Sequence, residues 1–304
     1  MGDKKTTIDK KKEFEKNLNN FIKDQLIEMK KNVKKHYKKN QGKRENNNFL
    51  LFNDENAKRY MGMGRSIDSQ LGTRLENIAF FLAREKYSFK CVPNIVNLII
   101  KNKELTVQTL SYPIKNGFSQ YIYMGEQDLC NLLPKKIKDK ECEICEYEFN
   151  LDANLDIDAA FNKMTNTNNK TKTRIPVDLL FFQLKTDKKN KKQTEIVSVN
   201  AYEIKAGGVL DTKNAEANAR EVNNLNSLLS FVEKCNCKFA TCYDGNGNGE
   251  PVDSLLSNLS RDKIVIAKEF WSEILPDYFD YNSFIETYKK AFDDAKVEDY
   301  LINE

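Results

Sequence analysis

The sequence predicts an α/β fold with a mixed central β-sheet flanked by helices and an N-terminal helical arm. Apolar residues recur at helical spacing over residues 8–36 and again over residues 66–86. Two strand-like apolar segments, residues 175–185 and 195–205, are separated by a short charged turn. From residue 212 onward, helix-like and strand-like segments alternate, as they do in α/β proteins.

The first 48 residues predict a basic amphipathic helical arm with a linker, and residues 49–304 predict the main domain. Residues 1–44 hold 14 Lys and one Arg against six acidic residues. Phe14, Leu18, Ile22 and Leu26 belong to an apolar stripe that favours packing on the core or a dimer contact. We interpret the lysine face as solvated, with a DNA-embracing arm as the alternative.

Composition excludes several classes of protein. The N-terminus lacks the apolar region of a secretory signal, and no stretch is long enough to span a membrane. The cysteines number seven, which is odd and atypical of a disulfide framework, so we expect a cytoplasmic protein. The single histidine, His36, lies among lysines, which excludes Ser-His-Asp triads, Cys-His pairs and multi-histidine zinc sites.

The region before residue 175 is less regular. Glu76 lies on the predicted helix 66–86 among small and apolar neighbours. Strands are expected near residues 89–110 and 120–125, followed by a short helix at 155–163. These assignments place Glu76 on a helix that precedes the sheet.

The two strands at 175–185 and 195–205 predict a hairpin with charges at one end. The turn is centred midway between Asp178 and Glu203, so these residues should lie opposite each other. Glu203 and Lys205 share a strand face with Val199, because side chains two residues apart point to the same side. A charged group there needs an ionic partner or a metal ion.

The chemistry of this cluster admits two interpretations. Two neighbouring carboxylates repel each other, and a divalent cation such as Mg²⁺ relieves the repulsion with hard oxygen ligands. Lys205 could then orient or deprotonate a water and stabilise negative charge, which suits attack on a phosphodiester. The alternative is a structural ion pair.

The C-terminal part predicts a turn at Gly207 and Gly208, an N-cap at Asp211 and a helix over 212–233. A strand at 238–243, a glycine-rich loop from Asp244, a strand at 263–267 and helices at 268–275 and 282–295 follow. The loop has Leu255 where a calcium loop needs a glutamate, so a glycine-rich turn near DNA is favoured.

Five of the seven cysteines are potential zinc ligands. Cys142 and Cys145 form one potential half-site, and Cys235, Cys237 and Cys242 the other. The halves are distant in sequence and the second has Cys-x-Cys spacing, which disfavours zinc.

Pro176-Val177-Asp178, followed after a turn by Glu203-Ile204-Lys205, resembles the PD-(D/E)XK nuclease signature. The segments GRSIDSQLGTRLE at 64–76 and EIKAGGVLDTKNAEANA at 203–219, with KEFWSEIL at 268–275, resemble type II restriction endonucleases of the TdeIII type. The resemblance implies a restriction-endonuclease-like fold and a Mg²⁺-dependent homodimer that cuts double-stranded DNA at a short palindrome, with GGNCC suggested. It also implies a cognate DNA methyltransferase that protects the same site.

Carried onto this chain, the resemblance assigns Asp178 and Glu203 as metal ligands with the Ile204 carbonyl, and Lys205 to the attacking water. Glu76 would hold a second ion or a metal-bound water. DNA contacts are expected at the start of the Glu76 helix, from Arg65, Ser66, Ser69, Gln70 and Arg74. Two alternatives stay open, namely a nuclease of DNA repair or of branched or single-stranded DNA, and a non-catalytic DNA-binding protein.

Overall fold

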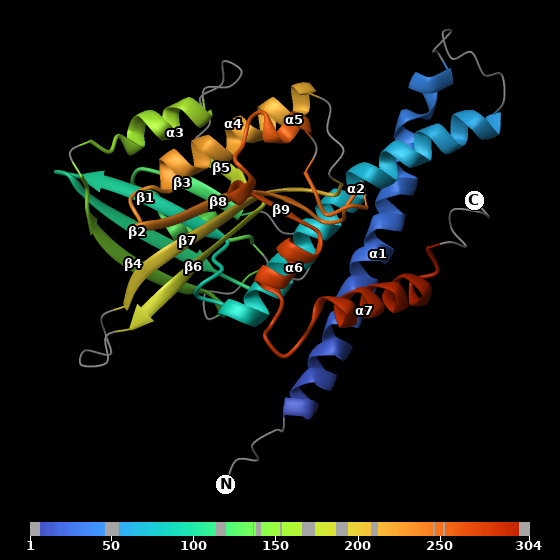
Figure 1. The fold of residues 1–304 in the computed structure, drawn as a ribbon, viewed down its shortest axis with the longest axis horizontal. Helices are drawn as coiled ribbons and strands as arrows, with labels where there is room; N and C mark the ends of the chain where they lie inside the picture. The colour runs from blue at the N-terminus through green and yellow to red at the C-terminus, as the bar shows by residue number, and fades with distance from the viewer. Residues whose placement is uncertain are drawn as a thin grey trace. The chain divides into compact units, whose positions relative to one another are not determined.

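The computed structural model confirms a mixed α/β architecture (Figure 1). It describes residues 7–45, 55–113, 120–135, 137, 141–152, 154–165, 174–186, 194–207, 212–245, 247–251 and 253–297. The chain groups into two compact units, one formed by residues 1–78 with 275–304 and one by residues 79–274. We call them the helical unit and the sheet unit. The predicted boundary at residue 48 lies outside the described residues.

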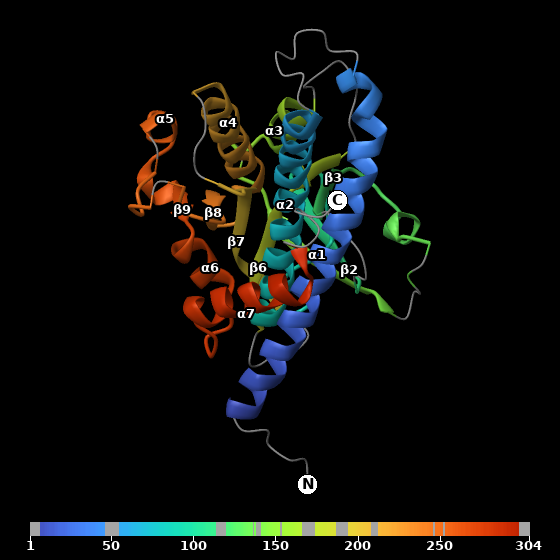
Figure 2. The ribbon, with the colours of Figure 1, turned by 90° about the vertical axis from the view of Figure 1, so that its right-hand side faces the viewer.

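The helical unit contains α1 (Thr7–Glu45), most of α2 (Glu55–Tyr87) and α7 (Tyr281–Asp294). Figure 2 shows α7 crossing α1, although they come from opposite ends of the sequence. Phe14 packs edge-to-face against Tyr278 and Phe279, with ring centroids 5.7 and 4.9 Å away. The apolar stripe of α1 is therefore buried within this unit, as the core-packing prediction required.

Both N-terminal helices are longer than predicted. Residues 38–45, expected to be part of a linker, continue α1, because Lys, Gln, Arg and Glu all favour helix. Helix α2 begins at Glu55 rather than near residue 66, and Gly64 lies within it. A glycine lowers helix stability by about 1 kcal/mol without ending the helix, so the prediction of a start beside it was wrong.

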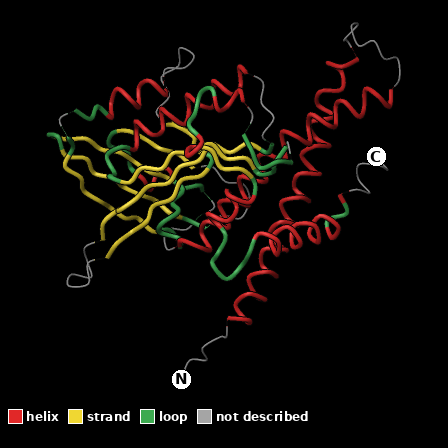
Figure 3. The backbone as a smooth tube through the Cα atoms, viewed as in Figure 1, coloured by secondary structure: helices red, strands yellow, loops and turns green. Residues whose placement is uncertain are grey.

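The sheet unit contains two sheets (Figure 3). The five-stranded sheet has the order β4-β2-β1-β3-β5, and the four-stranded sheet the order β6-β7-β8-β9. Their bounds are β1 (Ile95–Lys101), β2 (Glu104–Ser111), β3 (Gln120–Met124), β4 (Glu143–Asn150), β5 (Arg174–Val177), β6 (Leu179–Thr186), β7 (Thr194–Lys205), β8 (Lys234–Thr241) and β9 (Ile264–Ile266). The remaining elements of this unit are η1 (Leu129–Leu132), α3 (Ile157–Thr165), α4 (Thr212–Leu229), α5 (Asp253–Leu256), η3 (Arg261–Lys263) and α6 (Lys268–Ile274).

The register of the β6–β7 hairpin was predicted correctly at its open end. Leu179 pairs with Tyr202 and Phe181 with Asn200 in an antiparallel ladder. The ladder shifts by one residue after Gln183, nearer the turn. Continuing the register from the Leu179–Tyr202 pair brings position 178 opposite Glu203.

Strand β7 is central in its sheet, with β6 antiparallel on one side and β8 parallel on the other. Helix α4 makes the crossover from β7 to β8, and Val222, Leu225 and Leu229 bury its apolar face against the core. The predicted N-cap Asp211 and the turn residue Gly208 lie outside the described residues.

The opposite face of the four-stranded sheet is covered by aromatic residues. Tyr87 from the end of α2 stacks on Phe181, and Phe181 stacks on Tyr202. The Tyr202 hydroxyl donates to the Glu273 carboxylate on α6, which also pairs with Lys238 at 2.6 Å. Strand β7 is thus held from both faces, which fixes its carboxyl end in place.

No helix in the described part of the chain has the length and apolar character needed to cross a bilayer.

Candidate active site

Asp178 occupies a bend between the two sheets. It follows β5, which pairs with β3 in the five-stranded sheet, and precedes β6 of the four-stranded sheet. Pro176 lies on β5, the edge strand, where a missing N–H is tolerated. The Asp178 Oδ2 atom accepts a hydrogen bond from the Ile204 amide at 2.8 Å. This bond ties the bend to the end of β7.

Gln120 also holds the chain just after this bend. Its Nε2 atom donates to the carbonyls of Pro93 and Leu180 at 2.6 and 2.7 Å, and its Oε1 atom accepts from the Leu180 amide at 2.6 Å. The side chain is only 3% exposed. The Gln120 side chain thereby satisfies backbone groups of Leu180 and Pro93 near the point where the chain passes from one sheet to the other.

Glu203 and Lys205 lie at the carboxyl end of β7, as predicted. Their side chains are 13% and 36% exposed, and the Lys205 ammonium contacts Glu203 Oε1. The Lys205 carbonyl accepts from the Cys242 amide at 2.9 Å, so the end of β7 remains tied to the chain after β8. The structure thus brings Asp178, Glu203 and Lys205 to one end of the hairpin.

The electrostatics of Lys205 reflect these neighbours. Burial alone would lower its pKa, but the carboxylates of Glu203, Asp178 and Glu221 outweigh burial and raise the pKa above the usual value. Without a metal ion, Lys205 is therefore a cation that neutralises part of the acidic cluster. A cation bound to the carboxylates would remove much of the influence that keeps Lys205 protonated.

Glu221 on α4 is an additional acidic residue that the sequence did not predict. Burial and the adjacent Glu203, to which the Glu221 carboxyl donates a hydrogen bond, raise the pKa of Glu221 to about 7. The residue is exposed on α4, and the pKa rises because a second negative charge beside Glu203 is unfavourable. The sequence indicates only that a helix follows the strand that carries Glu203 and Lys205. It does not indicate which residue of that helix faces the strand.

The predicted residues on α2 belong to the helical unit. Because α2 begins at Glu55, the backbone amides of residues 65–70 lie inside the helix and are not the free amides of a helix N-terminus. These residues therefore do not stand at the start of the helix as expected, and their contacts with DNA stay a prediction. Ser69 is exposed and Ser66 and Gln70 are half-buried, whereas the Arg65 side chain lies outside the described residues.

Arg74 is 6% exposed and holds helices together. Its guanidinium donates to Gln25 on α1 and to Gln70, and Gln25 Oε1 also accepts from Asn77 at 2.7 Å. This position favours a structural role for Arg74 over contact with a phosphate. Glu76 is half-buried in the same helix, and its role beside a metal ion stays a prediction.

The donor set of the site suits a hard cation. Asp178 and Glu203 supply carboxylate oxygens, the backbone supplies the Ile204 carbonyl, and Mg²⁺ commonly takes one or two carboxylates and keeps its waters. The raised pKa of Glu221 beside Glu203 indicates that negative charge is crowded here. Among the described residues, no group of three or more His, Cys, Asp or Glu side chains is arranged to hold a metal ion.

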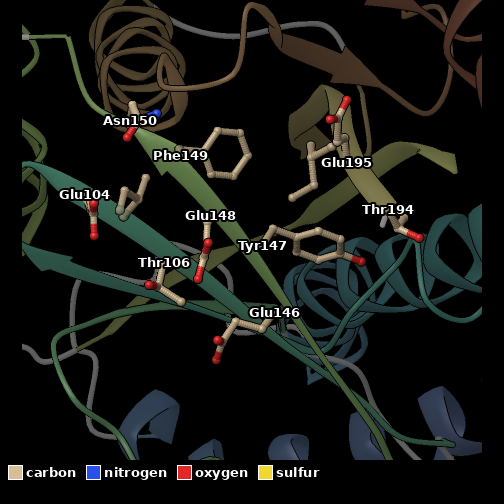
Figure 4. Close-up of a pocket in the computed structure, with 11 residues that line it drawn as sticks. Glu104, Thr106, Glu146, Tyr147, Glu148, Phe149, Asn150, Thr194 and Glu195 are labelled. Atoms are coloured by element: carbon tan, nitrogen blue, oxygen red, sulfur yellow. The ribbon is translucent and has the colours of Figure 1, made fainter. Parts of the chain in front are cut away.

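A separate cavity of about 610 Å³ lies at the opposite end of β7 (Figure 4). It is lined by Thr194 and Glu195 of β7 and by β2 and β4, including Glu104, Glu146 and Glu148. Four glutamates repel a polyanion, so this cavity is a poor candidate for DNA. Its lining shares no residue with the Asp178 cluster.

The other predicted candidates have structural explanations. Asp244 accepts from the amides of Gly247 and Gly249 at 2.9 and 2.6 Å, and both glycines have positive φ, so the loop is a glycine turn closed by its own aspartate. Cys235 and Cys237 are neighbours on β8, with sulfurs 3.7 Å apart. Cys142 and Cys145 lie at or beside β4 in the other sheet.

Comparisons of the chain with protein-family models, with curated proteins and with solved structures found no match.

Proposed function

We propose that this protein is a Mg²⁺-dependent nuclease that cuts double-stranded DNA, with Asp178, Glu203 and Lys205 in its active site. The observation that carries the proposal is the meeting of these three side chains where β5 bends into β6 beside the end of β7. Antiparallel β6 and β7, followed by the α4 crossover to parallel β8, support the restriction-endonuclease-like fold that the PD-(D/E)XK resemblance implies.

Each side chain would have a separate role in the reaction. Asp178, Glu203 and the Ile204 carbonyl would hold the ion, which supplies charge neutralisation and a more acidic water. Lys205, released from its contact with Glu203, orients the attacking water or takes its proton and stabilises charge on the phosphate. Attack of water on phosphorus with departure of the 3′ oxygen leaves 5′-phosphate and 3′-hydroxyl ends.

Within this class, we propose a type II restriction endonuclease that acts as a homodimer on a short palindromic site, with GGNCC as the candidate sequence. Two copies related by a two-fold axis would present one cluster to each strand of a palindrome. This finer assignment rests on the resemblance of residues 64–76, 203–219 and 268–275 to such enzymes.

One observation favours a non-catalytic alternative. The Lys205–Glu203 contact satisfies both charges without a metal, as a structural ion pair would. Incubation with mixed-sequence duplex DNA in Mg²⁺ and in EDTA separates the possibilities. Discrete fragments in Mg²⁺ alone would support a restriction enzyme, and general degradation would support a repair-type nuclease. Intact DNA under every condition would exclude both.

A further inference from the structure

The charge on α1 is distributed unevenly. Residues 7–29 contain five lysines and five acidic residues, so they carry no net charge. Residues 30–39 contain six lysines and no acidic residue. One continuous helix thus changes from balanced to strongly basic within a single turn.

Most of these lysines lie on the outer side of the helix. Val33 and Met29 are 1% and 4% exposed and mark the buried side. At 100° per residue, Lys31, Lys35 and Lys38 lie about 140° to 160° around the helix from Val33. All three are exposed, as are Lys34 and Lys39. We call these five lysines the basic face.

Lys30 does not belong to this face. Its ammonium donates to the carbonyls of Ala295 and Lys296 at 2.9 and 3.0 Å, just after α7. Lysines near helix ends commonly bind such carbonyls. Lys30 therefore has a role within the fold, whereas the basic face points outward.

The basic face opposes helix formation. Like charges three or four residues apart repel, and Lys31, Lys35 and Lys38 are spaced in this way with no acid between them to offset the repulsion. A rod-shaped polyanion along the helix would relieve it, because the charges form a row about 12 Å long. Duplex DNA offers such a line of charge, about one per 1.7 Å of its axis.

We propose that the basic face binds the phosphate backbone of duplex DNA without reading its sequence. The inference rests on the proposed function in taking DNA as the substrate. Its physical basis is charge complementarity, because each lysine that neutralises a phosphate releases a counterion. Phosphate contacts of this kind set affinity and association rate and carry no sequence information.

The test compares two triple variants of the full-length chain. Lys31→Gln, Lys35→Gln and Lys38→Gln together remove three charges of the basic face. The control removes three exposed charges from the balanced part of the same helix, at Lys10, Lys12 and Lys16. Lys11 is left intact, because it pairs with Asp280 and donates to Ser283 near the start of α7.

Binding to a fluorescent 30-base-pair duplex of arbitrary sequence is measured in EDTA over a range of salt concentrations. We expect the slope of log affinity against log salt to fall in magnitude by about 2 to 3 in the basic-face variant, and by less than about 1 in the control. Circular dichroism checks that both variants keep their helix content.

Equal slopes for the two variants, or an unchanged slope for the basic-face variant, would overturn the inference. So would a loss of binding to anionic phospholipid vesicles with DNA binding intact. The binding measurement is made in EDTA and needs no cleavage, so its outcome does not depend on whether the protein is a nuclease. A slope change in a protein that never cuts DNA would support the inference and count against the nuclease.

Discussion

At the scale of single residues, the sequence predicted the Asp178, Glu203 and Lys205 cluster because strand geometry has a fixed period. Alternation placed Glu203 and Lys205 on one face, and the centre of the turn placed Asp178 opposite Glu203. Glu221 could not be found this way. Its contact with Glu203 depends on how α4 is rotated over the sheet, and packing sets that rotation.

Lys205→Met tests the role of the ammonium in the proposed reaction. We expect DNA cleavage to fall about a hundredfold or more, because the group that orients the water and stabilises charge is lost. Stabilisation by Mg²⁺, measured as a shift in melting temperature, should persist because Asp178 and Glu203 remain. Lys234→Met, an exposed lysine on β8, is the matched control. Cleavage at the wild-type rate would remove Lys205 from the mechanism.

Glu221→Gln gives a pH-dependent prediction for the metal-free protein. The pKa of Glu221 is about 7 in the folded state against 4.5 ordinarily, so the folded state binds more protons between these values. Its contribution to the free energy of unfolding therefore declines as pH rises through this window. Glutamine does not titrate, so the free energy of unfolding of the variant does not decline for this reason. As pH rises from about 4.5 to 7, the variant should therefore become more stable relative to wild type.

Urea denaturation in EDTA across that pH range measures the Glu221 effect, and Glu216→Gln, on an exposed position of the same helix, is the control. A stability difference between variant and wild type that does not depend on pH would contradict the prediction.

At the scale of elements, regular patterns were predicted well and irregular ones poorly. The hairpin and the α4 crossover follow from long apolar periodicity. Strand β4 was not predicted from the sequence. Cys145, Tyr147 and Phe149 do alternate with Glu146 and Glu148, but the exposed glutamates give the segment a polar composition that is typical of a loop. The break at Asp178 was also missed, since the transfer of the chain between two sheets leaves the apolar run almost unchanged.

Gln120→Leu tests how the bend at Asp178 is held. The substitution leaves the amide of Leu180 and the carbonyls of Leu180 and Pro93 without their side-chain partner, which should cost about 2 to 4 kcal/mol of unfolding free energy. Gln127→Leu, which removes one long hydrogen bond to Met124, should cost less than about 1 kcal/mol. Equal losses in urea denaturation would show that Gln120 does not secure the bend.

At the scale of the whole molecule, the sequence predicted an α/β protein with a basic arm but not the grouping of the chain. The helical unit joins α1 to α7 from opposite ends of the sequence. Each helix has its own apolar stripe, but neither stripe predicts which helix it packs against. Long-range packing of this kind is decided by the fit of side chains such as Phe14 and Phe279.

The proposed homodimer has a measurable consequence. Sedimentation equilibrium of the DNA-bound protein in Ca²⁺, an ion chosen to occupy the site without supporting cleavage, should give two chains of 35.3 kDa per duplex. Cutting both strands of a palindrome requires two clusters, one from each copy. A single chain per duplex would contradict the dimer while leaving the nuclease assignment open.

Cleavage by Asp178→Asn tests the central claim most directly. Asparagine keeps an oxygen that can accept from the Ile204 amide, so the bend is preserved while the charge proposed to bind the metal ion is lost. Wild type and variant are incubated with the same duplex DNA in Mg²⁺, with Glu148→Gln, from the acidic cavity, as the control. We expect wild type and Glu148→Gln to cut, and Asp178→Asn to bind DNA but cut at least about a hundredfold more slowly. Cutting at the wild-type rate by Asp178→Asn would contradict the account.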